Sequence, residues 1–249
     1  MAAASGSMRK ASDDKRFTGE TPMLRYAVLG MIGLAASTAW AQQTPPTEPP
    51  PPASTQTSNA VVAMEEPLPG DRWTYEVRDE ITGTVSATRT TVVAEVTPKE
   101  VSTRVDTLGN SIPGQIIFDR SWNMIVSGSW KYSPHDGSGI PSPLAVGKTW
   151  NFQSNDVNSS TGSNWKRSGK SKVVGQETVT TKAGTFETHK IETSYSSHSA
   201  KDPTSKSEVT VETWYAPAID HWVKRTFISR TNKHLLINNT TELTAYGRK

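Results

Sequence analysis

Short runs of alternating apolar and polar residues, rich in Val, Thr and Trp, cover the chain from residue 66 to residue 249. This two-residue period predicts β-strands, and no segment shows a convincing 3.6-residue apolar period that would predict a helix. Glycine- and proline-containing turns separate the runs. The predicted strands are 71–79, 84–97, 100–107, 114–119, 122–128, 148–155, 164–180, 185–196, 207–216, 221–231 and 234–246. We therefore predict an all-β fold class in one domain, residues 66–249, built as a large antiparallel sheet.

The most strongly specified hairpin is Glu212–Phe227, with the sequence ETWYAPAIDHWVKRTF. Pro217 lacks a backbone N–H donor and fixes φ, so the first strand is predicted to end near Ala216. Asp220 suits the turn that follows. The segment is therefore predicted to fold as strand, tight reversal and strand.

The alternation within this hairpin also predicts the faces of its strands. Val223 and Phe227 should share one face of the second strand, and Lys224 should lie on the other. Trp214 and Trp222 are predicted to pair across the two strands. Two interpretations of these aromatic residues are open, because they either hold the hairpin together or line a ligand groove.

A second pattern is an internal echo of the form Gly-[Asp or Lys]-x-Trp-x-aromatic, at residues 70–75 and again at 147–152. In each copy the Trp and the aromatic residue two positions later face the same side of a strand. The glycine lets the chain turn into that strand. Residues 92–97 also resemble 173–178. The echo predicts two similar β-meander halves, and chance similarity in a Thr- and Val-rich chain is the alternative.

Residues 23–41, MLRYAVLGMIGLAASTAWA, have the features of a secretory signal peptide. An arginine precedes an apolar run that is too short and too rich in small residues for a membrane span. The run ends in an Ala-x-Ala site, which predicts cleavage between Ala41 and Gln42. The polar residues 1–22 then have two explanations. They are either an extension created by a misassigned start, with Met23 as the true first residue, or an unusually long beginning of the signal.

The next segment, residues 42–65, is rich in proline among Thr, Gln, Ser and Ala. This composition favours an extended polyproline conformation and predicts a proline-rich linker. The chain contains no cysteine. It therefore forms no disulfide, has no thiol nucleophile and carries no lipidated cysteine at the signal junction. These features predict a periplasmic or secreted protein that is soluble after signal cleavage and has no transmembrane anchor.

Charge adds little to this picture once the predicted signal is removed. The remaining chain has 22 Lys and Arg against 21 Asp and Glu, so it is nearly neutral. Its densest basic cluster, residues 165–172, is interpreted as a solvated strand face. Because no Lys or Arg cluster follows one face of the fold, we predict no binding to nucleic acid.

Three motifs carry a resemblance to a known family. They are GKTWNF at 147–152, VVGQETVTTKAGTFETHKI at 173–191 and WYAPAIDHWVKR at 214–225. In this order they resemble the TapB-like families of uncharacterised exported β-domains, over about residues 143–230. The resemblance implies a large curved antiparallel sheet, similar to the half-barrel of bacterial lipoprotein carriers, and it supplies no catalytic residues. The chain departs from the family at 220–222, where the family has a glycine turn.

The sequence offers little support for catalysis. None of the five histidines lies at ligand spacing from another within one strand or helix, so no metal site is predicted. There is no Gly-x-Ser-x-Gly elbow, no phosphate-binding loop and no dinucleotide fingerprint. We therefore predict a protein that is not an enzyme and that needs no cofactor.

Binding by tryptophans is the remaining chemistry, since seven of them follow the predicted cleavage site. Trp122, Met124 and Val126 are predicted to share one strand face. A curved sheet that leaves a concave apolar face open suits a lipid, an acyl chain or a hydrophobic peptide. The alternative is that the tryptophans fill the core. The candidate ligand-binding residues are Trp122, Met124, Trp130, Trp214 and Trp222, and loop 132–146 is the candidate lid or rim.

These expectations combine into one functional hypothesis. The protein is predicted to be an exported, non-enzymatic β-domain on a proline-rich tether, with an apolar ligand such as a lipid or acyl chain on the concave face of its sheet. The alternative is an envelope structural or protein-interaction module without a small ligand, whose partner would be an envelope protein.

Overall fold

The computed structural model describes Met64 and residues 66–248. The predicted extension (1–22), the predicted signal peptide (23–41) and all of the predicted linker (42–65) except Met64 lie outside the described residues. No helix in the described part of the chain is long and apolar enough to cross a membrane.

The described residues form strands joined mostly by short turns, with a longer connection at residues 134–148 and a single turn of 3-10 helix, η1 (Pro217–Ile219). The strands are β1 (Arg72–Asp79), β2 (Thr84–Val96), β3 (Glu100–Thr107), β4 (Gly114–Asp119), β5 (Met124–Ser127), β6 (Trp130–Ser133), β7 (Thr149–Asn158), β8 (Asn164–Thr181), β9 (Gly184–Ser199), β10 (Lys206–Ala216), β11 (His221–Thr231) and β12 (His234–Gly247).

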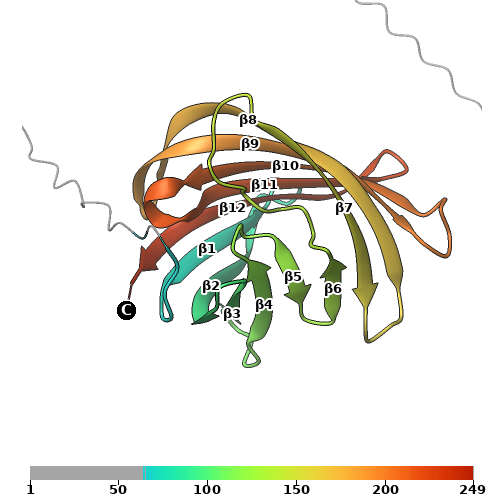
Figure 1. Cartoon of the computed structure of the whole chain (residues 1–249), viewed down its shortest axis with the longest axis horizontal. Helices are drawn as coiled ribbons and strands as arrows, with labels where there is room; N and C mark the ends of the chain where they lie inside the picture. The colour runs from blue at the N-terminus through green and yellow to red at the C-terminus, as the bar shows by residue number, and fades with distance from the viewer. Residues whose placement is uncertain (1–63, 65, 249) are drawn as a thin grey trace, which may run out of the picture. The chain divides into compact units, whose positions relative to one another are not determined.

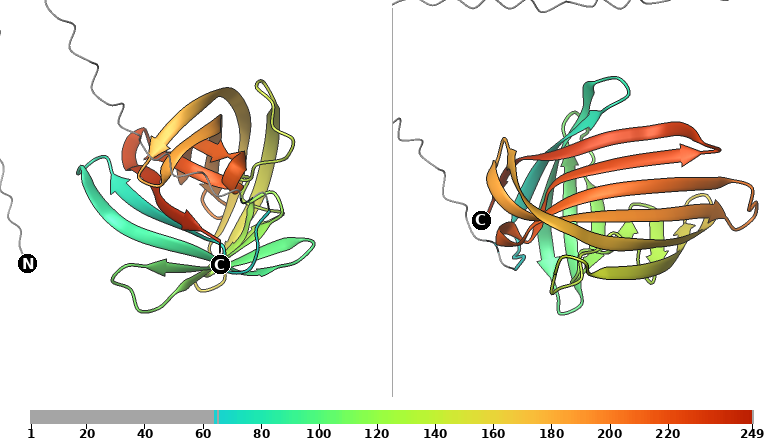
Figure 2. Two further views of the ribbon diagram at one scale, coloured as in Figure 1. Left: turned by 90° about the vertical axis from the view of Figure 1, so that its left-hand side faces the viewer. Right: turned by 90° about the horizontal axis from the view of Figure 1, so that it is seen from above.

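Every strand is antiparallel to the strand that follows it in the sequence, and β12 pairs with β1. The sheet therefore closes into a barrel in which consecutive strands are neighbours (Figures 1 and 2). The last six strands are longer than most of the first six and arch over β4, β5 and β6 (Figure 1). The predicted all-β class and large curved antiparallel sheet are confirmed, and the two edges of the sheet hydrogen-bond to each other.

The strand predictions agree closely with the structure, except around residues 122–133. Trp122 adopts a left-handed conformation with φ of 61°, so β5 begins only at Met124. The four residues of β6 were predicted as loop or left unassigned, because four residues are too few to show a period. Pro134, which follows directly, also ends the strand on its C-terminal side.

The predicted hairpin forms as β10, η1 and β11. β10 ends at Ala216, and Asp220 closes the turn in the left-handed region with φ of 45°. The predicted pairing of Trp214 with Trp222 is wrong. Trp214 pairs with Lys224, and Trp222 pairs with Tyr215, because a bulge shifts the register between the two positions.

The two Gly-x-x-Trp turns have the same backbone hydrogen bonds. The Gly70 N–H donates to the carbonyl of Val93 at 2.8 Å, and the Gly147 N–H donates to the carbonyl of Val173 at 2.8 Å. Both glycines have positive φ, 95° and 90°. The turns open β1 and β7, so each starts six consecutive strands of the barrel.

Two groups of buried apolar side chains lie in the barrel. The larger group surrounds Trp73, which is fully buried and packs edge-on against Trp122 with ring centroids 5.7 Å apart. The smaller group follows the second glycine turn and consists of Ile140, Val173 and Ile191, with Leu144, Trp150 and Tyr215 packed against it. The larger group combines Met64, Trp73, Tyr75, Val93, Val101, Phe118, Trp122, Phe186, Trp214, Ala216, Ile219, Val223 and Leu243.

Candidate functional site

A cavity of about 330 Å³ lies inside the barrel, in the part built by β5 to β11. We call it the interior cavity. This size falls at the lower end of the range of small-molecule sites. Apolar, aromatic and charged side chains share its wall. It is lined by Met124, Tyr132, Asp136, Gly137, Ser138, Phe152, Arg167, Thr193, Tyr195, Val211, Thr213, Arg225 and Phe227.

Strand register explains why these side chains meet. On β10 and β11, Thr213 is opposite Arg225 and Val211 is opposite Phe227. Directly opposed residues in a sheet share a face, and so do residues two apart along a strand. The four side chains therefore project together into the barrel, and Thr193 on β9, opposite Val211, joins them.

Arg225, on β11, is one of three charged side chains in the wall. Its Nε donates a hydrogen bond to Thr213 Oγ1 at 3.1 Å, and its guanidinium lies 4.0 Å from the ring centre of Trp222. Burial lowers the pKa of Arg225, and Asp136 opposes this effect. The residue thus remains a cation in a poorly solvated place.

A second arginine, Arg167 on β8, has its charge balanced within the wall. Its Nη2 lies 2.7 Å from Asp156 Oδ2, and its Nη1 donates to the carbonyl of Asp136 at 3.2 Å. The guanidinium also lies near the rings of Tyr132 and Tyr195, at 5.4 Å and 4.7 Å. Burial raises the pKa of Tyr132 to about 12, even though Arg167 favours the phenolate.

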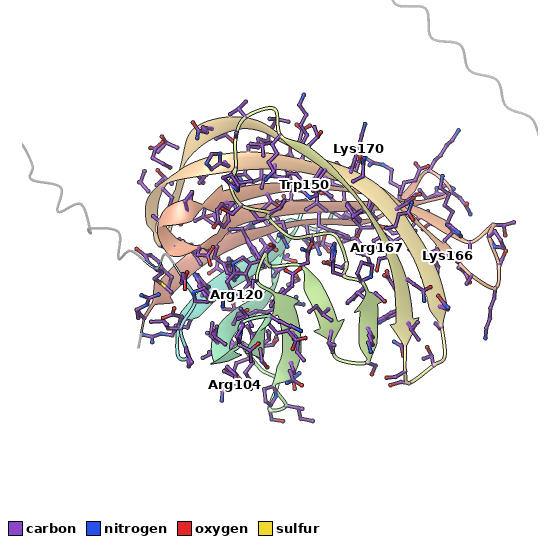
Figure 3. The ribbon with its side chains drawn as sticks, viewed as in Figure 1. Arg104, Arg120, Trp150, Lys166, Arg167 and Lys170 are labelled. Atoms are coloured by element: carbon purple, nitrogen blue, oxygen red, sulfur yellow. The ribbon has the colours of Figure 1, made fainter. Side chains whose placement is uncertain are left out.

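The position of Arg167 corrects the interpretation of residues 165–172 as a solvated face. Arg167 lies beneath the arch of β8, whereas Lys170 points outward from the same strand (Figure 3). Lys166, Lys170 and Lys172 are exposed, as predicted for a solvated face. The arginine alternates with these lysines along the strand and therefore faces the interior.

The connection between β6 and β7 supplies one side of the cavity. Asp136 Oδ1 accepts hydrogen bonds from the Met124 N–H at 2.8 Å and from the Ser138 N–H at 3.0 Å. The Gly139 N–H donates to Asn123 Oδ1 at 2.8 Å. These bonds hold residues 136–138 of the candidate lid loop in the wall of the cavity.

A glycine allows this connection to approach the β7 strand closely. A Cβ at Gly137 would lie 2.0 Å from the Phe152 ring, and Gly137 has φ of 79°. Both the space and the backbone conformation therefore require glycine.

A smaller cavity of about 190 Å³ shares Met124, Ser138 and Arg225 with the interior cavity. Its wall also includes His221, whose Nδ1 lies 2.7 Å from the Tyr75 hydroxyl. That hydroxyl donates to the Trp222 carbonyl at 2.9 Å, so its oxygen accepts from the His221 Nδ1–H. Burial lowers the pKa of His221 well below 6.5, which keeps the ring neutral.

The five candidate ligand-binding residues are not all brought together. Met124 lines both cavities, and Trp222 lines the smaller one. Trp122 is buried in the larger core group, where its Nε1 donates to Asp220 Oδ2 at 3.2 Å. Trp214 is also buried in that group, and Trp130 on β6 lines neither cavity.

The prediction that Trp122, Met124 and Val126 share one strand face is wrong. Trp122 precedes β5, while Met124 pairs with Phe118 and Val126 pairs with Ile117. Phe118 and Ile117 are consecutive on β4 and face opposite sides, so their partners do too. A register shift in β5 causes the difference.

The charged members of the site were missed by sequence reasoning, although one had a signal. Arg225 lies between Val223 and Phe227 in the alternation of β11, so it occupies an apolar register position. An arginine at such a position is a candidate for a buried functional charge. Asp136 and Arg167 gave no comparable signal, because Asp136 lies in the connection between β6 and β7 and Arg167 lies among exposed lysines on β8.

In chemical terms, the wall offers groups that can bind a ligand through charge, aromatic rings and apolar contacts. The wall has one cation with spare donors, two tyrosine rings and several apolar side chains. In the described part of the chain, no group of three or more His, Asp or Glu residues is placed to hold a metal ion.

Comparison with family models gives a match over part of this site. A model described as DUF3108-like matches residues 140–227. The matched segment spans β7 to β10 and part of β11, and it contains Arg167, Tyr195 and Arg225. The TapB-like name is not confirmed, although the matched segment nearly coincides with that resemblance.

Solved structures with the same fold include two described as exported or lipoprotein-type proteins. One is a candidate lipoprotein from Parabacteroides distasonis ATCC 8503, with 15% identity, a TM-score of 0.51 and coverage of 74% of this chain and 99% of that chain. The other is a candidate exported protein with a YmcC-like fold from Bacteroides fragilis NCTC 9343, with 16% identity, a TM-score of 0.52 and coverage of 75% and 100%. At this identity the likeness shows the fold alone. No curated protein matches the chain.

Proposed function

We propose that this protein is an exported, non-enzymatic binding module that holds an apolar or amphipathic ligand, such as a lipid or acyl chain, inside its barrel. The observation that carries the proposal is the interior cavity, where Met124, Phe152 and Phe227 form an apolar wall. A closed barrel with a partly apolar interior is a common architecture for holding one small ligand.

Export is supported by the signal-peptide pattern at 23–41 and the Ala-x-Ala site before Gln42. The two similar structures are described as a lipoprotein and an exported protein, which agrees with a periplasmic or secreted location. The lack of cysteine distinguishes this chain from a lipoprotein.

Native mass spectrometry with lipid extraction, on protein purified from the periplasm, tests the proposal. We expect a stoichiometric adduct that is released on extraction. The matched variants are Val211→Trp, which places a large ring in the cavity, and Thr210→Trp, which places the same ring on the exposed face of β10. The adduct should be lost in the first and kept in the second. A bare polypeptide mass with no extractable lipid in the unmodified protein would contradict the proposal.

A second candidate function, an envelope protein-interaction module, is favoured by exposed apolar residues on neighbouring hairpins. Leu108 and Ile112, between β3 and β4, are 82% and 75% exposed. Ile81 and Leu236, on the β1–β2 and β11–β12 hairpins of the same rim, are also exposed. Apolar patches of this kind mark interaction surfaces. A stable complex with an envelope protein and no bound lipid would favour this alternative.

A further inference from the structure

The cavity wall contains a cation whose hydrogen-bonding capacity is mostly unused. A guanidinium has five N–H donors. The Nε of Arg225 donates to Thr213 Oγ1, but neither Nη1 nor Nη2 has a hydrogen-bond acceptor among the described residues. Within the same part of the chain, no carboxylate lies within 4.0 Å of this guanidinium. Four N–H donors on Nη1 and Nη2 are therefore free to bind something else.

The neighbouring arginine shows what a satisfied guanidinium looks like in this wall. Arg167 has an ion pair with Asp156 through both Nε and Nη2, at 3.0 Å and 2.7 Å, and a further bond from Nη1 to a carbonyl. Arg225 has no such partner, although the two residues line the same cavity. Arg167 therefore belongs to a structural ion pair, whereas the guanidinium of Arg225 can bind a ligand.

An unpaired charge in a poorly solvated place costs stability, so an uncompensated arginine in an interior is uncommon. Stacking on Trp222 offsets part of this cost. An anion in the cavity would offset more of it, because a guanidinium binds a carboxylate or phosphate through two parallel hydrogen bonds.

The position of Arg225 also indicates the form of the ligand. The residue lines both the interior cavity and the smaller one, so a group bound to it lies between two spaces. Apolar side chains flank it on either side, Phe152, Val211 and Phe227 in the first space and Val77, Ile116 and Phe118 in the second. An alkyl chain can extend from the charged group along either wall.

The number of charges on the ligand is limited by Asp136, whose carboxylate lies in the same wall. Its Oδ1 is bound by backbone and hydroxyl donors, which keeps the carboxylate in place. A like charge nearby disfavours a second negative charge on the ligand. A singly charged headgroup therefore fits better than a doubly charged one.

Building on the proposed function, we propose that the ligand is an amphipathic monoanion whose carboxylate or phosphodiester group is bound by Nη1 and Nη2 of Arg225. A free fatty acid and a phospholipid-type headgroup share this chemistry, and the experiment distinguishes them.

The test is isothermal titration calorimetry with three 12-carbon probes: dodecanoate, dodecanoyl-lysophosphatidylglycerol and the neutral dodecanol, each below its micelle-forming concentration. The variants are Arg225→Gln, Arg225→Lys and the control Arg230→Gln. Arg230 lies on the same strand, is exposed and lines neither of the two shared cavities, so its replacement removes the same charge elsewhere. Circular dichroism establishes that each variant is folded.

We expect at least one of the two anions to bind the unmodified protein, and the tighter one identifies the source of the headgroup. Arg225→Gln should weaken that binding by roughly 10- to 100-fold, the range of a hydrogen bond to a charged group. Arg225→Lys should retain part of the affinity, because lysine keeps the charge but loses the paired donors. Arg230→Gln should leave it unchanged.

Two results would overturn the inference in different ways. If dodecanol binds as tightly as the anions, and Arg225→Gln has no effect, then the interior binds apolar chains without recognising an anion. The inference about Arg225 then fails, while the proposed ligand-binding function is retained. If no probe binds and the purified protein carries no lipid, both proposals fail. If Arg225→Gln does not fold, the binding of dodecanoate and of dodecanol to Arg225→Lys is compared instead. Weaker binding of dodecanoate alone supports the inference, and unchanged binding of both probes overturns it.

Discussion

The two Gly-x-x-Trp turns have the same backbone but hold different parts of the molecule. In the first, the buried carboxylate of Asp71 accepts hydrogen bonds from the Leu68 N–H at 2.8 Å and from Arg248 Nε at 3.1 Å. In the second, Lys148 occupies the equivalent position, and its Nζ donates to the carbonyls of Pro141 and Pro143 at 2.7 Å and 2.6 Å. The negative charge of Asp71 therefore binds Arg248, which follows β12. The positive charge of Lys148 binds the connection between β6 and β7.

The packing beside Asp71 differs from the packing beside Lys148. Next to the first turn, Trp73 is fully buried and stacks on His221 with ring centroids 4.3 Å apart. Next to the second turn, Trp150 is only half-buried, and the connection that Lys148 anchors continues into the cavity wall. The repeated backbone turn therefore fixes where a strand starts, whereas the side chains near it decide whether the adjoining interior is packed around a fully buried tryptophan or borders the interior cavity.

Replacing Trp73 or Trp150 should show the largest difference in stability between the two turn regions. Trp73→Ala removes a fully buried ring from a packed aromatic group, so we expect the free energy of unfolding to fall by about 3–5 kcal/mol. Trp150→Ala removes a half-buried ring, so its cost should be clearly smaller. Urea denaturation followed by circular dichroism measures both. Equal losses would show that the second interior is packed as tightly as the first.

Replacing Asp71 and Lys148 should give a smaller difference in the free energy of unfolding than replacing the two tryptophans. Asp71→Ala leaves the Leu68 N–H and Arg248 without their partner, which should cost about 1–3 kcal/mol. Lys148→Ala should cost less, because water can replace the lysine at the Pro141 and Pro143 carbonyls.

Amide hydrogen exchange sharpens this second prediction. The N–H groups of Gly139 and Ile140 are bonded to Asn123 and Ser121. Lys148→Ala should speed their exchange, because it loosens the connection, and Asp71→Ala should leave it unchanged. The opposite pattern would show that Lys148 does not hold the cavity wall.

The sequence predicted the fold better than the site, for a physical reason. Strand positions depend on a local two-residue period, which is why β11 was predicted at its observed bounds, 221–231. Register shifts are not visible in such a period. The bulges near Trp214 and Met124 therefore overturned the predicted Trp214–Trp222 pair and the shared face of β5.

The candidate site was harder to predict because it combines strands with a connection. The tryptophans drew attention as large apolar residues, yet Trp122 and Trp214 turned out to be core residues. The cavity is instead marked by Arg225 and Asp136, which are polar residues placed among apolar ones. Only the alternation of β11, where Arg225 takes the place of an apolar residue, indicated a buried charge.

The interior beside Trp73 should also differ from the interior cavity in its response to acid, because His221 stacks on Trp73. The pKa of this ring is lowered well below 6.5 by burial, and Arg225 lowers it further. The unfolded chain takes up a proton at His221 below about pH 6.5, while the folded protein does not until the pH is much lower. Stability is therefore fully present above this pH and is lost as the pH falls from 6.5 toward the folded pKa.

The expected slope is at most about 1.4 kcal/mol per pH unit for one proton. Urea denaturation between pH 7.5 and pH 5 measures it in a window above the usual titration of carboxylates. His221→Phe should flatten the slope even if it lowers stability overall, because phenylalanine takes up no proton. His189→Asn is the matched control, since His189 is less buried and its pKa is lowered only by partial desolvation. An unchanged slope in His221→Phe would mean that the acid response arises outside the Trp73 group, and that the two interiors differ in packing but not in charge.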